Sequence, residues 1–152
     1  MGIAAPPESA IVRVVVYDSS VLFKLVVDEP DSGQAQALVN SARIIVPKFM
    51  FLEVGNALWS RVQRGQLDLR QAKRLLDRIR EFRFETLQVA PFVDRSLELA
   101  SLLSHPIYDC LYIAVAEFAA VPLVTADKRF VAAVNRGKLR IAEVIELADF
   151  VL

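Results

Sequence analysis

Short apolar runs alternate along this chain with longer stretches in which apolar residues recur at helical spacing. The first run, Ile11–Tyr17, is β-branched and nearly continuous, which is typical of a strand buried on both faces. Apolar runs at Ile44–Val46 and Pro122–Thr125 predict two further strands. Weaker strand signals lie at Thr86–Ala90 and near Leu139–Ala142. The chain is therefore expected to contain four or five strands.

The stretches between these strands predict amphipathic helices. Asp31 or Ser32 can cap a helix, Gly65 stands where a helix C-terminus belongs, and Pro91 can open another helix. The expected helical segments are 18 to about 30, 32–40, 48–64, 68–83, 91–103, 108–119 and a short helix from 127. Strands that alternate with helices predict an α/β/α sandwich around a central parallel sheet, with the strand order left open.

The composition supports one folded domain. The 152 residues are 55% hydrophobic and 24% charged, which is too apolar for a disordered chain. No uncharged apolar run reaches the roughly 18 residues of a membrane helix, and the first ten residues lack the features of a secretory signal. We therefore expect a loose tail at residues 1–10, a domain over 11–152, no membrane partner and a cytoplasmic location. A single cysteine, Cys110, excludes an internal disulfide, and a single histidine, His105, excludes a zinc site of His and Cys ligands.

Four acidic residues stand at positions where a purely structural role is unusual. Asp18 follows the first strand and Asp127 follows the strand that ends at Thr125. Ligands of open α/β sheets bind beyond such strand ends. Glu53 and Asp109 lie in strongly apolar helical segments, without a lysine or arginine three or four positions away. Because an ionised carboxylate is rarely buried unpaired, the four acids are predicted to converge on one edge of the sheet.

Each acid also has a structural interpretation. Asp18 and Asp127 can cap helices, Asp109 can complement a helix dipole, and Glu53 can be a solvated residue of a partly exposed helix. Taken together, however, four close carboxylates raise one another's pKa unless a cation neutralises them. Oxygen ligands favour Mg²⁺ or Mn²⁺, and these ions support phosphodiester cleavage.

Four motifs, in this order along the chain, resemble the PIN-domain nucleases: DSSVLFK, EVGNAL, YDCLYIAVA and LVTADKRF. The resemblance covers about residues 12–145 and is nearest to the ribonuclease toxins of VapBC-type toxin–antitoxin pairs. It implies metal binding by Asp18, Glu53, Asp109 and Asp127, with support from Ser20, Asn56 and Thr125. It also implies a PIN-like fold, an RNA substrate, a cognate antitoxin and a homodimer. Cys110 departs from the family, which usually has a small residue there.

Several other polar and aromatic residues are interpreted as structural. Ser19 is expected to cap a helix, His105 to have a structural role in a loop before a proline, and Tyr108, Tyr112 and Trp59 to be core or interface aromatics.

A basic stretch between Arg61 and Arg83 holds eight basic and three acidic residues, although the formal net charge of the chain is zero. A solvated helix face held by ion pairs is the ordinary interpretation of such a stretch. If a metal neutralises the four site acids, the chain has 18 basic residues against 14 remaining acidic ones. Most of this surplus of positive charge lies within 48–83. Arg74 and Arg78 are then predicted to bind RNA phosphates.

The sequence thus predicts a metal-dependent endoribonuclease that acts as a toxin. A phosphoacceptor receiver domain, which is also α/β with clustered acids, is a poorer match. That fold needs adjacent acids after the first strand and a lysine near the end of the last strand. Here Asp18 is followed by two serines, and Lys138 precedes the last expected strand. A catalytically silent PIN-like module that binds RNA or protein remains the alternative. Helices 48–64 and 68–83 are also expected to form a groove for a partner segment or a homodimer seam. Their large apolar residues are Phe49, Met50, Phe51, Trp59, Leu75, Leu76 and Phe82.

Overall fold

The computed structural model describes residues 13–137 and 141–151, which contain one parallel sheet of five strands in the order β3-β2-β1-β4-β5. The strands are β1 Arg13–Tyr17, β2 Ala42–Pro47, β3 Glu85–Leu87, β4 Leu123–Thr125 and β5 Val144–Glu146. The chain first builds outward from β1 through β2 to β3, and then returns to add β4 and β5 on the other side of β1. The sheet order therefore reverses between β1 and β4, which is where open α/β sheets place their ligands.

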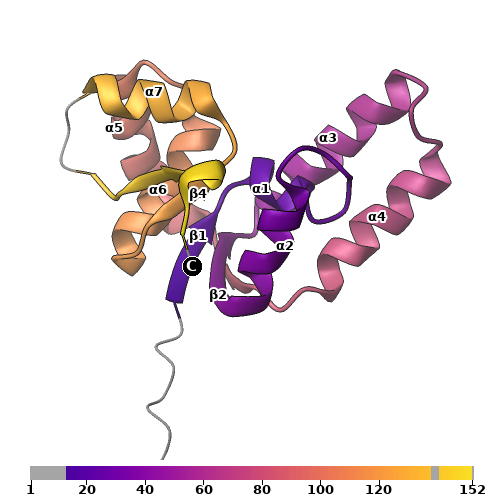
Figure 1. The fold of residues 1–152 in the computed structure, drawn as a ribbon. Coiled ribbons are helices and arrows are strands. Elements are labelled where there is room, and N and C mark those ends of the chain that lie inside the picture. Colours follow the sequence, from indigo (N-terminus) through magenta and orange to yellow (C-terminus); the bar gives the residue numbers. More distant parts are fainter. Residues whose placement is uncertain (1–12, 138–140, 152) are drawn as a thin grey trace, which may run out of the picture.

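The helices cover the sheet and extend beyond it. They are α1 Ser19–Phe23, α2 Ser32–Ser41, α3 Met50–Gln63, α4 Leu69–Glu81, α5 Val93–Leu103, α6 Ile107–Ala119 and α7 Lys128–Gly137, with short 3₁₀ helices at Ala90–Phe92 and Leu147–Asp149. Figure 1 shows α5, α6 and α7 grouped together, whereas α3 and α4 form a hairpin that projects away from the sheet. The predicted α/β/α sandwich with a parallel sheet is confirmed.

Helix α6 is the central helix of the core. All seven residues from Cys110 to Ala116 are buried, and the helix packs on β1, β2 and β4. A helix that is apolar on every side has to be covered on every side, which accounts for this position. Only its first turn approaches the carboxyl ends of the strands, and that turn carries Asp109.

The α3–α4 hairpin owes its shape to local signals. Gly65 has φ +69°, a left-handed conformation that glycine adopts without strain, and its N–H donates to Val62 O at 3.0 Å. Asp68 then opens α4 with a capping box, in which its carboxylate accepts from Gln71 N at 2.7 Å and the Gln71 side chain accepts from Asp68 N at 2.7 Å. The predicted helix end at Gly65 is confirmed.

Several predicted boundaries in the first half of the domain are wrong. The first helix ends at Phe23 and not near residue 30, and Lys24 Nζ donates to Pro30 O at 2.7 Å across the loop that follows. Asp31 does occupy the N-cap position of α2, one of the two predicted, but with φ 69° and without a capping hydrogen bond from its side chain. The Ser32 hydroxyl donates to Val27 O.

Three predictions in the second half of the domain are wrong or fall partly outside the described residues. The weak strand predicted from Thr86 lies at Glu85–Leu87, and Pro91 belongs to a 3₁₀ turn before α5. The last strand pairs with β4 at 144–146, and residues 141 and 142 precede it without strand structure. The predicted residues 139 and 140, like the predicted tail at 1–10, lie outside the described residues.

No single helix within the described ranges is long and apolar enough to cross a membrane. In the same part of the chain, only the pair Ala90–Leu103 and Ile107–Ala119, bent by 117° at the break between them, reaches that length and composition together.

Candidate active site

Asp18 lies at the point where the sheet order reverses. It follows β1 directly, is only 4% exposed, and accepts hydrogen bonds from the backbone N–H groups of Ser20 at 3.1 Å and Val21 at 3.3 Å. The hydroxyl groups of Ser20, at 2.5 Å, and Thr125 also donate to this carboxylate. Asp18 therefore caps α1, as the structural interpretation expected, and it also joins the end of β1 to the end of β4.

Asp127 lies on the neighbouring strand end and is held in a similar way. Its carboxylate accepts from Arg129 N at 2.9 Å and Phe130 N at 3.2 Å, so it caps the start of α7. Its own N–H donates to Thr125 Oγ1 at 3.0 Å. The hydroxyl of Thr125 thus contacts both aspartates, which explains why this threonine is fully buried at a strand end.

Glu53 and Asp109 come from the first turns of α3 and α6. The buried Tyr112 hydroxyl donates to Glu53 Oε2. His105 Nε2 lies 2.7 Å from Asp109 Oδ2. Each of these two acids is therefore oriented by a side chain of α6 or of the loop that precedes it.

The electrostatics show that the acids influence one another. The pKa of Asp18 is raised to about 6, mainly by burial and in part by the charge of Asp109, against hydrogen bonds from Ser20 and Thr125 that lower it. The pKa of Glu53 is raised to about 7, again mainly by burial and in part by the charges of Asp109 and Asp18. The pKa of Asp109 is also raised by burial and by the charge of Asp127, against the hydrogen bond from His105. The four predicted acids therefore lie close enough for the charge of one to shift the pKa of another.

The oxygen atoms of the four acids are the ligands that a hard cation prefers, although the four carboxylates do not surround a common point. All four acids supply oxygen, and none of them forms an ion pair with a lysine or arginine of the described residues. Over the same part of the chain, no three Asp, Glu, His or Cys side chains form a compact metal-binding group. Three of the carboxylates are instead hydrogen-bonded to protein side chains: Asp18 to Thr125, Glu53 to Tyr112 and Asp109 to His105.

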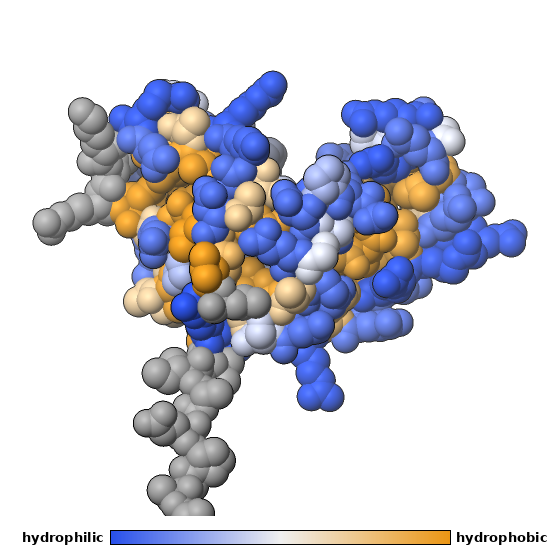
Figure 2. Space-filling model, in the orientation of Figure 1, coloured by the Kyte–Doolittle hydropathy of each residue, from blue (hydrophilic) through white to orange (hydrophobic). Residues whose placement is uncertain are grey.

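Two hollows adjoin the acids. The first, of about 590 Å³, lies between α1, α3 and the start of α7 and is lined by Ser19, Ser20, Phe23, Lys24, Glu29, Ala57, Ala126, Asp127, Lys128 and Arg129. The second, also of about 590 Å³, is lined by Ser19, Phe49, Leu52, Glu53, Asn56, Ala57 and Tyr108. Figure 2 shows the surface deeply notched between the part that carries α7 and the α3–α4 hairpin. In the second hollow the exposed Asn56 lies beside Glu53, as the spacing of three residues on one helix predicts.

Three side chains that shape the site have roles beyond those predicted from the sequence. His105, expected to be structural, lies four residues before Asp109, a spacing that places both on one side of the chain. Tyr112, expected to be a core aromatic, is buried but also binds Glu53. Ser19 does not cap α1, because Asp18 does, and it lies instead near Glu53, whose carboxyl pKa it lowers. The i, i+4 spacing could have indicated His105, whereas nothing local indicates the other two.

The predicted RNA-binding arginines lie outside this cluster. Arg74 and Arg78 are exposed on α4, and neither forms an ion pair within the described residues, whereas Asp77 pairs with Arg80 at 2.5 Å. The predicted apolar groove also needs correction, because Met50 is fully buried and most of its predicted companions are partly buried. The large apolar residues that the hairpin does expose are Leu52, Trp59 and Leu69, at 68%, 58% and 64%.

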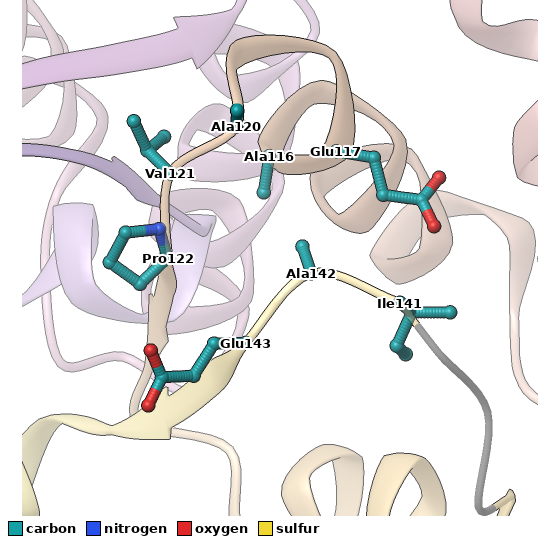
Figure 3. Close-up of a pocket in the computed structure, with 8 residues that line it drawn as sticks. All are labelled: Ala116, Glu117, Ala120, Val121, Pro122, Ile141, Ala142 and Glu143. Carbon is teal, nitrogen blue, oxygen red and sulfur yellow. The ribbon is translucent and has the colours of Figure 1, made fainter.

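A further pocket, of about 490 Å³, lies at the opposite edge of the sheet. It is lined by Ala116, Glu117, Ala120, Val121, Pro122, Ile141, Ala142 and Glu143. Its two carboxylates point away from each other in Figure 3, and Glu117 accepts from Arg95 Nε at 2.9 Å. Because its two acids point apart and Glu117 is paired with Arg95, this pocket does not offer a second acidic site.

Comparisons with known proteins agree with the fold and the site, which together define an α/β domain with an acidic, oxygen-lined centre. The family model for the PIN domain matches residues 15–135. Ribonuclease VapC3 of Pyrobaculum aerophilum is 32% identical over 119 residues, which cover 76% of this chain and 90% of that protein. The chain belongs to the PIN domain family.

Solved structures show the same fold. The crystal structure of PAE2754 from Pyrobaculum aerophilum has a TM-score of 0.66 and 26% sequence identity, covering 90% of this chain and 92% of that one. VapBC2 from Rickettsia felis, solved with a DNA fragment from its promoter, has a TM-score of 0.59 and 13% identity, covering 88% of this chain and 98% of that one. The sequence-based resemblance to PIN domains is therefore confirmed.

Proposed function

We propose that this protein is a metal-dependent endoribonuclease and the toxin of a VapBC-type toxin–antitoxin pair. The observation that carries the proposal is the mutual influence of Asp18, Glu53, Asp109 and Asp127, whose charges act on one another, with raised carboxyl pKa values in three of them. Membership of the PIN domain family and the likeness to Ribonuclease VapC3 support the reaction class.

We assign the metal-binding role to the same four carboxylates, with Mg²⁺ or Mn²⁺ as the ion. When bound, such an ion activates water and stabilises the charge that develops on a phosphodiester. Ser20 and Thr125 fix Asp18 through their hydroxyl groups, while Tyr112 and His105 orient Glu53 and Asp109. Asn56 lies beside Glu53 in the second hollow, where its amide is available to substrate.

We further propose a cognate antitoxin and a homodimer. The similar structure from Rickettsia felis is that of VapBC2, which supports an antitoxin for this chain. The exposed side chains of Leu52, Trp59 and Leu69 on the α3–α4 hairpin would be covered by such a partner.

The proposed function predicts that the purified protein cleaves single-stranded RNA in Mg²⁺, and that the chain is toxic on induction unless its neighbouring gene is co-expressed. The first result comes from gel analysis of RNA fragments, and the second from growth curves together with the mass of the complex in solution. RNA that is bound but stays intact in Mg²⁺ would instead identify a catalytically silent PIN-like module.

Charge reversal at Arg74 and Arg78 (R74E and R78E together) is expected to weaken RNA binding and to flatten its salt dependence. Each phosphate contact releases condensed counterions, so removing two contacts lowers the slope of log K against log salt by about 1.4 for a single strand. The measurement is a salt titration of the binding constant. Reversal at Arg80, whose charge is already paired with Asp77, is the matched control. An unchanged slope would return α4 to the interpretation as a solvated helix face.

A further inference from the structure

Two aromatic rings form a stacked pair at the border of the acidic site. Phe49 immediately precedes α3, and Tyr108 lies in the first turn of α6. Their ring centroids are 5.3 Å apart and their planes are inclined by only 16°. Tyr108 directly precedes Asp109, and Phe49 lies one helical turn before Glu53, whose N–H donates to Phe49 O at 3.2 Å. The pair is thus fixed to the two helices that supply acids to the site.

The two rings separate two hollows of different character. On one side lies the hollow that also contains Glu53 and Asn56. On the other side lies an apolar slot of about 210 Å³, lined by Phe49, Val89, Val93, Ser96, Ile107, Tyr108 and Leu111. Apart from Tyr108, the slot has one residue with a hydroxyl group, Ser96, and this hydroxyl donates to Phe92 O at 2.7 Å. An aromatic surface therefore continues from the acidic hollow into an apolar slot.

The Tyr108 side of the pair is open to solvent. Phe49 packs partly against the core, whereas Tyr108 is 58% exposed. An exposed aromatic ring that a second ring holds in a fixed orientation is suited to stacking, because little conformational freedom remains to be lost on binding. Proteins that bind single-stranded RNA use such rings as platforms for unstacked bases.

We infer that Tyr108 is a base-stacking residue that receives a nucleobase next to the phosphate held at the acidic site. This inference rests on the proposed function. In a nucleotide, the base and the phosphate are joined through a single sugar and therefore lie close together. Tyr108 is next to Asp109 in the chain and shares a hollow with Glu53. Its ring is therefore suited to the base of the nucleotide whose phosphate lies at the acidic site. Stacking tolerates any sequence, so the expected ligand is an unpaired purine or pyrimidine base, and a base held in a duplex is excluded.

The test measures binding of a mixed-sequence, single-stranded RNA of about 12 nucleotides, within the range of site sizes known for single-strand binders. The parent protein carries Asp127→Asn, which slows cleavage and lies away from the aromatic pair. Tyr108→Ala is expected to weaken binding about 5- to 150-fold, which corresponds to roughly 1–3 kcal/mol for one stacked base. Tyr108→Phe, which keeps the ring, is expected to bind as the parent does. The matched control is Phe118→Ala, another exposed aromatic on α6, which packs edge-on against Phe92.

A series of RNAs with one base removed or replaced by 2-aminopurine locates the contact. The loss caused by Tyr108→Ala is expected to disappear when the stacked base is absent, and 2-aminopurine at that position is expected to be quenched by the parent but not by the variant. A loss that is equal for every abasic RNA would overturn the inference. So would a loss accompanied by a change from dimer to monomer in solution, which would identify Tyr108 as a contact between two copies of the chain.

Failure of the inference can be told apart from failure of the proposed function. Cleavage by the protein without substitutions reports on the function alone, because it does not involve the Tyr108 variants. Binding and 2-aminopurine quenching report on the stacking residue alone, because both are measured without cleavage. RNA that is cleaved normally and bound equally by Tyr108 and Tyr108→Ala proteins would overturn the stacking role and leave the nuclease assignment intact.

Discussion

Substitution of Asp109 by asparagine is expected to lower the rate of RNA cleavage about 10²- to 10³-fold, equivalent to about 2.7–4 kcal/mol of transition-state stabilisation. The substitution removes one charge from the acidic site at nearly constant shape. The amide that replaces the carboxylate retains an oxygen that can accept from His105, so the fold is expected to persist. The measurement is the cleavage rate at saturating Mg²⁺, together with the melting temperature of the metal-free protein.

The melting temperature separates a catalytic role of Asp109 from a structural one. Burial and the charge of Asp127 raise the pKa of Asp109, so removing its charge relieves unfavourable interactions and the metal-free variant is expected to melt at the same temperature as the parent or higher. Glu117→Gln is the matched control, since Glu117 lies at the other end of α6 and pairs with Arg95. It is expected to leave the cleavage rate unchanged. A metal-free D109N protein that melts well below the parent would show that Asp109 is structural.

Removal of divalent metal is expected to abolish cleavage, and its return is expected to stabilise the fold. Four oxygen-donating acids that lack lysine and arginine partners in the described part of the chain need a cation to offset their repulsion. At 100-fold excess over its dissociation constant, Mg²⁺ or Mn²⁺ should add about 2.7 kcal/mol, or roughly 5–10 °C in melting temperature. The readouts are RNA cleavage in excess EDTA and thermal unfolding with and without metal. Cleavage that continues undiminished in EDTA would contradict the metal-dependent mechanism.

The metal-free protein should also show a distinctive pH dependence. The folded pKa values of Asp18 and Glu53, about 6 and about 7, lie above the unfolded values near 4, so between these limits the folded state binds more protons than the unfolded state. The contribution of these two groups to stability is therefore greatest near pH 4 and falls as the pH rises toward 7. For Asp18 alone the loss is about 3 kcal/mol. Thermal unfolding across this pH range measures it, and saturating Mg²⁺ should flatten the decline, because the bound ion favours the ionised carboxylates.

The local pattern of the chain determined the class of fold and the identities of the acids. A β-branched run before Asp18 indicates a buried strand whatever it packs against, and acids in apolar helices are conspicuous because burying their charge costs free energy. Gly65 could also be assigned, since the left-handed turn that ends α3 is a property of the local backbone. These inferences depend on residues within a few positions of one another.

Only the tertiary structure decided the strand order and the contacts that position the acids. Thr125 reaches Asp18 across 107 positions of sequence, and Tyr112 reaches Glu53 across 59. No periodicity encodes such pairs, because they exist only once β4 has been placed beside β1 and α6 has been packed against the sheet. The same holds for the stacked pair of Phe49 and Tyr108, whose rings meet because α3 and α6 begin at one edge of the fold. Sequence composition identifies which residues can do chemistry, whereas long-range packing decides which of them share a site.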